Sequence, residues 1–112
     1  MQTNLKQLSE QYFKIFSNKD IEALSDMFSE EVSLRDWELQ ASGKTAVIAA
    51  NENIFSSVET INVEPTHIFC DNNTVIAELN ITVNSDVELL VTDIIEFDDN
   101  GKITDIRAYK GN

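Results

Sequence analysis

The segment Glu88–Phe97 limits the possible folds most, because it has the pattern of a central β-strand and yet carries an acid in its apolar row. Alternation places on one face Leu89, Val91, Asp93, Ile95 and Phe97. An isolated ionised carboxylate is costly to bury, so Asp93 must be paired, hydrogen-bonded or held neutral by a raised pKa. Asp93 is therefore the first candidate site residue.

Two helices are predicted before this strand. The first follows Asn4 as N-cap, with Gln7 in the capping-box position, and its apolar residues recur at three- and four-residue spacing: Leu5, Leu8, Tyr12, Ile15 and Phe16. Asp20 is expected to cap the second helix, whose apolar stripe is Ile21, Leu24, Met27 and Phe28. The pattern predicts a helical hairpin with Tyr12 on its buried face.

The period then changes from helical to two. Val32, Leu34 and Asp36 are predicted to share one face of a strand, which puts a second acid at the end of an apolar row, with Trp37 on the other face. A polar loop leads to Gly43 and a third helix, whose buried stripe is expected to be Val47, Ala50, Ile54 and Val58, widened by Phe55.

The rest of the chain reads as four strands joined by short turns, at residues 61–69, 75–83, 88–97 and 102–110. Pro65 cannot donate to a β-ladder and so indicates an edge strand or a bulge, and Asn100-Gly101 is typical of a tight hairpin turn. The order predicts one α+β domain, residues 1–112, with three N-terminal helices packed on a curved, mostly antiparallel sheet.

Charge and composition exclude several kinds of partner. The formal net charge of −12 opposes binding to nucleic acid or to an anionic membrane surface. The first ten residues lack the features of a leader, and no run approaches the ~18 apolar residues of a membrane span. The single Cys70 excludes an internal disulfide, so a cytoplasmic location is expected. With one histidine and one cysteine, we expect no metal and no cofactor.

Tyr12, Asp36 and Asp93 are the polar residues that periodicity turns inward. Burial raises a carboxyl pKa by up to ~3–5 units, so that one acid stays neutral while another ionises and the pair can move protons. The alternative is two aspartates solvated at the edge of the sheet, with Tyr12 only capping the core. Periodicity leaves both interpretations open.

A small apolar ligand is expected to contact the residues around these three. His67 is included because it shares a predicted face with Ile61 and Val63, although a lone histidine beside an apolar row is more often hydrogen-bonded structure. The expected substrate-binding residues are Phe16, Trp37, His67, Leu79, Val91, Ile95 and Lys110.

Nearly the whole chain resembles the nuclear transport factor 2-like superfamily, which includes SnoaL-like proteins, and within it most specifically the steroid Δ5-3-ketoisomerases. The resemblance lies in the helical hairpin through Asp36-Trp37, in Ser42-Gly43-Lys44-Thr45, and in the stretch from Thr92 to Gly111. It implies a cone-shaped fold. It also implies Asp36 as the general base that moves a proton between the α and γ carbons of a ketone, with Tyr12 and a protonated Asp93 as the oxyanion hole.

The chain departs from the isomerases at Trp37, Asn51 and Lys110. The superfamily also contains cyclases, dehydratases and binding modules, so the alternative function is a non-catalytic ligand-binding or protein-interaction module. A homodimer is expected, because Leu90 and Ile94 are predicted on the face of the sheet opposite the helices, where apolar side chains would otherwise meet water.

Overall fold

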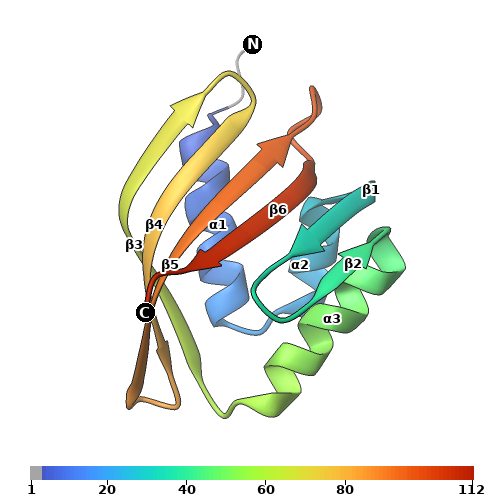
Figure 1. The fold of residues 1–112 in the computed structure, drawn as a ribbon. Helices are drawn as coiled ribbons and strands as arrows, with labels where there is room; N and C mark the ends of the chain where they lie inside the picture. The colour runs from blue at the N-terminus through green and yellow to red at the C-terminus, as the bar shows by residue number, and fades with distance from the viewer. Residues whose placement is uncertain (1–3) are drawn as a thin grey trace.

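The computed structural model describes residues 4–112, which form three helices packed on a six-stranded mixed sheet (Figure 1). Residues 1–3 of the expected domain lie outside the described residues. They also begin the ten-residue segment that was expected to lack the features of a leader. The helices are α1 (Leu5–Ser17), α2 (Ile21–Met27) and α3 (Lys44–Ser57). The strands are β1 (Phe28–Arg35), β2 (Gln40–Ser42), β3 (Ile61–Asp71), β4 (Thr74–Val83), β5 (Val87–Phe97) and β6 (Ile103–Lys110).

Side-chain caps begin the first two helices, as predicted. The Asn4 side chain accepts a hydrogen bond from the Gln7 N–H at 3.1 Å, and that of Asp20 accepts one from the Ala23 N–H at 3.2 Å. Each cap satisfies a backbone donor that the helix leaves unpaired, which typically contributes ~1 kcal/mol. The helix boundary at Phe28 was wrong: Phe28 has extended backbone angles and opens β1.

The segment expected as a polar loop before Gly43 contains β2, which pairs antiparallel with β1. Gly43 ends this hairpin and precedes α3 with φ = +89°, a left-handed conformation that favours glycine. The buried residues of α3 are Val47, Asn51 and Phe55, while the other residues of the expected stripe, Ala50, Ile54 and Val58, are half-buried. The inner face of α3 therefore carries a polar side chain in its middle.

The strand β3 lies at the edge of the sheet and contains a bulge, so both expectations from Pro65 are confirmed. Pro65 pairs with Leu79 but His67 already pairs with Glu78, which leaves one extra residue in β3. Beyond the bulge the side chains change faces, because alternation shifts by one residue. Ile68 is half-buried, whereas His67 is exposed and Phe69 is 62% exposed. The prediction that His67 and Phe69 face inward was therefore wrong.

The strand order is β2-β1-β6-β5-β4-β3, with β1 and β6 parallel and every other neighbouring pair antiparallel. The helices α1 and α3 cover different strands of the sheet. The helix α1 packs against β3 and β4, and α3 packs against β1 and β2. The inward side chains of β5 and β6 lie between them. No helix in residues 4–112 is long and apolar enough to cross a membrane.

Of the predicted row on β5, Val91, Asp93, Ile95 and Phe97 are buried, as expected, and Leu89 is half-buried. The core is closed around the end of the sheet where Val75 pairs with Ile95 and Phe97 with Ile103, and all four of these side chains are at most 1% exposed. At the other end, where Val83 pairs with Val87, the facing side chains are only half-buried or exposed. The interior is therefore filled at one end and open at the other.

Candidate functional site

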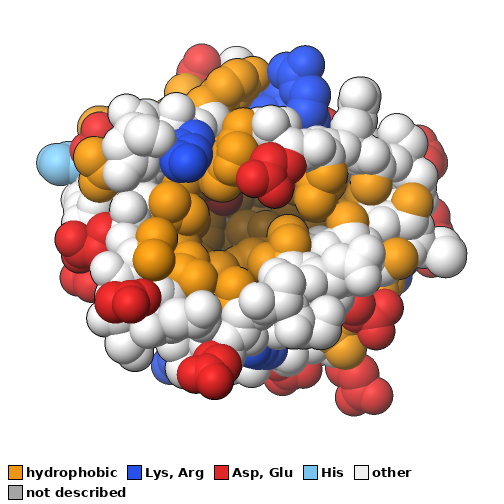
Figure 2. All heavy atoms as spheres, turned by 60° about the horizontal axis from the view of Figure 1, so that its bottom comes forward, with side chains coloured by type: hydrophobic (Ala, Val, Ile, Leu, Met, Phe, Trp, Pro, Cys, Tyr) orange, Lys and Arg blue, Asp and Glu red, His pale blue; other side chains and the backbone are white. Residues whose placement is uncertain are grey.

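A cavity of about 380 Å³ opens at this second end, between α1, α3 and the inward face of the sheet. Its volume lies within the ~300–1,000 Å³ typical of small-molecule sites. Figure 2 shows a hollow ringed by hydrophobic side chains, with acidic and basic side chains at its rim. The buried apolar wall includes Leu34, Val63, Leu79, Val91 and Ile106.

Asp93 lies in the wall of the cavity at the middle of β5 and is 8% exposed. Its cross-strand neighbours are two alanines, Ala77 on β4 and Ala108 on β6, whose small side chains leave space beside the carboxyl group. Burial, with a smaller contribution from the charge of Asp36, raises the pKa of Asp93 to about 7. A carboxyl group in this environment keeps its proton well above the usual range and can donate a hydrogen bond.

Tyr12 reaches the same cavity from α1 and is 5% exposed. Its ring packs against Phe13 and Phe16, with centroid distances of 5.5 and 6.2 Å. Burial first, and the charge of Asp93 second, raise the pKa of the Tyr12 phenol well above its ordinary value. The hydroxyl group therefore stays protonated and is a permanent donor.

Asp36 follows the last residue of β1, lines the cavity and is half-buried. Its Oδ1 accepts hydrogen bonds from the backbone N–H groups of Glu38 and Leu39, at 2.7 and 2.9 Å, and its own N–H donates to the Leu39 carbonyl. These bonds hold the carboxylate in one orientation. Within residues 4–112 they occupy one of its two oxygens, and Oδ2 is left to accept a proton or a further hydrogen bond.

The polar groups of Tyr12 and Asp93 are open to the cavity. Neither group makes a hydrogen bond to another residue in 4–112. In that part of the chain, Ser9 Oγ is the single fully buried side-chain polar atom without a partner, so the polar atoms of Tyr12 and Asp93 must be accessible. The Tyr12 hydroxyl and the Asp93 carboxyl are therefore not sealed in the core. The Tyr12 hydroxyl, the Asp93 carboxyl and the Asp36 carboxylate thus line the same largely apolar cavity.

Five of the expected substrate-binding residues line the cavity: Phe16, Trp37, Leu79, Val91 and Lys110. The strand β1 ends at Arg35, and the hydrogen-bonded turn after Asp36 brings Trp37 to the cavity instead of to the other face of the strand. Lys110 Nζ lies 6.0 Å from the centroid of the Trp37 ring, a cation–π contact. Trp37 is 42% exposed, so this contact lies at the cavity mouth.

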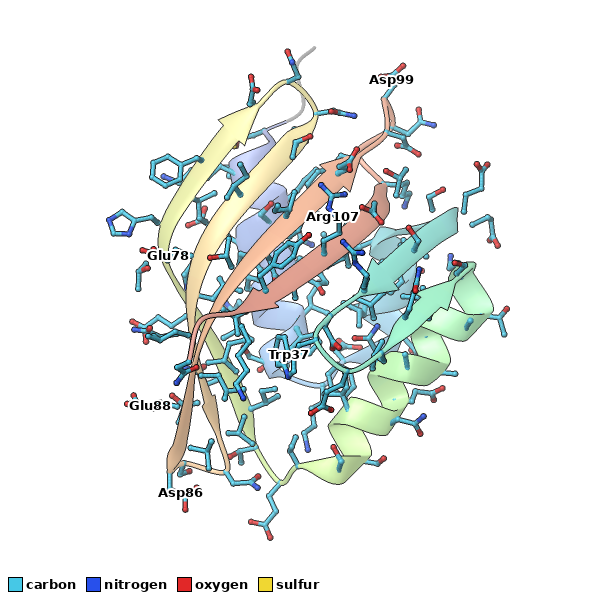
Figure 3. The ribbon with its side chains drawn as sticks, in the orientation of Figure 1. Trp37, Glu78, Asp86, Glu88, Asp99 and Arg107 are labelled. Carbon is cyan, nitrogen blue, oxygen red and sulfur yellow. The ribbon has the colours of Figure 1, made fainter. Side chains whose placement is uncertain are left out.

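Two of the expected residues lie elsewhere. Because of the β3 bulge, His67 is exposed, and its Nδ1 lies 3.0 Å from Glu78 Oε1. Figure 3 shows Glu78 at the side of the molecule away from Trp37. Ile95 is fully buried in the closed core beyond the cavity. Among residues 4–112, no group of three His, Cys, Asp or Glu side chains could hold a metal ion.

Asn51 also lines the cavity, although the sequence indicated it only as a departure from the isomerases and not as a site residue. It is 2% exposed, and its Nδ2 donates to the Val47 carbonyl at 2.9 Å. The available signal was its spacing, four residues after Val47 and four before Phe55, which places an amide on the apolar face of α3. The pattern of apolar residues alone does not reveal such a polar residue.

The fold is that of nuclear transport factor 2-like domains. A nuclear transport factor 2-like protein of unknown function from Cytophaga hutchinsonii superposes with a TM-score of 0.81 at 14% identity, covering 99% of this chain and 93% of that one. A proposed SnoaL-like polyketide cyclase from Shewanella denitrificans gives a TM-score of 0.86 at 16% identity, with coverages of 98% and 92%. At such identities the similarity concerns the fold.

A proposed ketosteroid isomerase from Kribbella flavida is also similar, with a TM-score of 0.80, 16% identity and coverages of 96% and 78%. The sequence profile of the SnoaL-like domain matches residues 9–106. The chain therefore belongs to the SnoaL-like domain family. No curated protein sequence matches the chain.

Proposed function

We propose that the protein binds a small apolar ketone in this cavity and moves a proton along it, as steroid Δ5-3-ketoisomerases do. Asp36 removes a proton from the carbon between the carbonyl group and a β,γ double bond. The electron pair shifts into a dienolate, whose oxygen accepts hydrogen bonds from Tyr12 and protonated Asp93. Protonated Asp36 then returns the proton to the γ carbon, which gives the conjugated ketone and regenerates the carboxylate.

The observation that carries this proposal is the environment of Asp93. A carboxyl group with a pKa of about 7, open to the cavity and without a partner in residues 4–112, has a proton that it can donate to a ligand oxygen. The negative charge on a dienolate is stabilised best by donors that are already in place. Tyr12 supplies the second donor, from the helix side of the same cavity.

The test is the conversion of a β,γ-unsaturated ketone to the conjugated enone, followed by its ultraviolet absorbance. We expect Asp36→Asn to lower the rate by ~10²–10⁴-fold, because the general base is lost. The matched control is Asp86→Asn, which makes the same change at an exposed turn. Equal rates for wild type and Asp36→Asn would contradict the catalytic role, as would an Asp93 carboxyl that titrates near 3.8 in a carboxyl NMR titration.

One observation favours the alternative, a non-catalytic ligand-binding or protein-interaction module. The two hydrogen bonds to Asp36 Oδ1 also build the turn between β1 and β2, and that structural role needs no chemistry. If the alternative holds, the ketone binds with no turnover above background. Binding and turnover measured on the same preparation separate the two functions.

We also propose that the protein is a homodimer and acts in the cytoplasm, as the sequence suggested. The outer face of the sheet supports the dimer, because Leu90 is 51%, Tyr109 47% and Ile76 39% exposed, and Ile94 lies among them. A patch of this kind on one subunit is covered when the same patch of a second copy pairs with it.

A further inference from the structure

Asn51 lies in the middle of the inner face of α3, between the buried side chains of Val47 and Phe55. Its amide orientation follows from its partner: the Val47 carbonyl is only an acceptor, so the group 2.9 Å from it must be the NH₂ and not the oxygen. The amide oxygen Oδ1 therefore points elsewhere.

Within residues 4–112 no group donates a hydrogen bond to this oxygen. The single hydrogen bond of the Asn51 side chain there is the one from its Nδ2 to Val47. It is also not sealed in the core, because Ser9 Oγ is the single buried side-chain polar atom without a partner in that part of the chain. Asn51 is 2% exposed and lines the cavity, so the opening that Oδ1 reaches is the cavity itself. A strong acceptor is thus open to the ligand space on the wall formed by α3.

We propose that the ligand carries, in addition to its carbonyl group, a neutral hydroxyl group that donates a hydrogen bond to Asn51 Oδ1. The position of the carbonyl group rests on the proposed function, whereas the hydroxyl group rests on Asn51 alone. The hydrogen-bonding roles are opposite at the two places. Tyr12 and Asp93 donate to an oxygen of the ligand, and Asn51 accepts from a hydrogen of the ligand.

A neutral donor fits better than an ammonium group. The amide has no charge, and its neighbours along the helix face, Val47 and Phe55, are apolar. An ammonium group held against this amide would lose hydration beside an uncharged acceptor and two apolar side chains, which costs far more than burying a hydroxyl group. A ketone without a hydroxyl group would in turn leave the amide oxygen unpaired when it displaces water from the cavity. The site therefore selects hydroxylated ketones over plain ones.

The experiment compares a bicyclic enone that bears a hydroxyl group with its analogue in which fluorine replaces that group. Fluorine is similar in size but donates no hydrogen bond, so isothermal titration calorimetry isolates the donor. We expect wild type to bind the alcohol ~10-fold more tightly at the best of several hydroxyl positions, and Asn51→Leu to bind both about equally. Asn53→Leu is the matched control: it is the same substitution on an exposed position of the same helix and should keep the preference.

The proposal would be overturned if wild type bound the hydroxylated enone and its fluorinated analogue equally well at every position tested. This comparison needs no variant. A preference that persists in a folded Asn51→Leu variant would overturn the assignment to Asn51. A third probe keeps the alcohol and lacks the ketone. If this probe binds wild type as tightly as the hydroxyketone and Tyr12→Phe changes neither affinity, the oxyanion hole of the proposed function fails while the role of Asn51 stands.

Discussion

Replacing Asp93 with asparagine should make the protein more stable at neutral and alkaline pH. The unfolded Asp93 carboxyl loses its proton near 3.8, and the folded one near 7. Between these values the unfolded state binds fewer protons than the folded state, so the free energy of unfolding of wild type falls as the pH rises. Asparagine is neutral and nearly isosteric, and removes this dependence.

The magnitude follows from the difference in pKa. A difference of about 3 units corresponds to ~4 kcal/mol at pH values above 7, at 1.36 kcal/mol per unit. Between pH 5 and pH 8 the stability of Asp93→Asn relative to wild type should rise by ~2–3 kcal/mol, and below pH 4 the ionisation of Asp93 should contribute almost nothing.

The assay is urea denaturation of both proteins at several pH values between 5 and 9, followed by the fluorescence of Trp37. The difference in the free energy of unfolding is plotted against pH, with Asp86→Asn as the control for loss of one exposed negative charge. A difference that does not change with pH would contradict this prediction, because it would mean that the Asp93 carboxyl titrates alike in both states.

Three further predictions concern other parts of the molecule. Tyr12→Phe should lower turnover of the unsaturated ketone by ~10²–10³-fold, because one oxyanion donor is lost, and a rate within twofold of wild type would exclude that role. Leu90→Asp should give a monomer in analytical ultracentrifugation, since a charge enters the exposed apolar patch, and a variant that remains dimeric would place the interface elsewhere. Ile95→Ala should lower the free energy of unfolding by ~2–5 kcal/mol in urea, because Ile95 is fully buried, whereas a loss below 1 kcal/mol would mean that the core collapses around the gap.

The local features of this protein could be predicted from its sequence because they depend on neighbours a few residues apart. The caps at Asn4 and Asp20 and the inward position of Asp93 belong to this class. Helical spacing also predicted that Tyr12 faces inward. The inward positions of Tyr12, Asp36 and Asp93, which the proposed proton transfer uses, could thus be predicted from the sequence. Period-two and period-3.6 patterns report which face a residue occupies, and burial of that face is what they predict well.

The relations between distant segments were decided by the tertiary structure. The bulge in β3 turns His67 outward. Pro65 indicated an edge strand or a bulge, but the position of the extra residue is defined only by the pairing with β4. The parallel pairing of β1 with β6 brings Asp36 into the cavity that Asp93 lines, and the packing of α3 on β1 and β2 brings Asn51 there. A cavity is the space that elements leave between them, so its polar groups are known only once long-range contacts have set the register of the strands and the places of the helices.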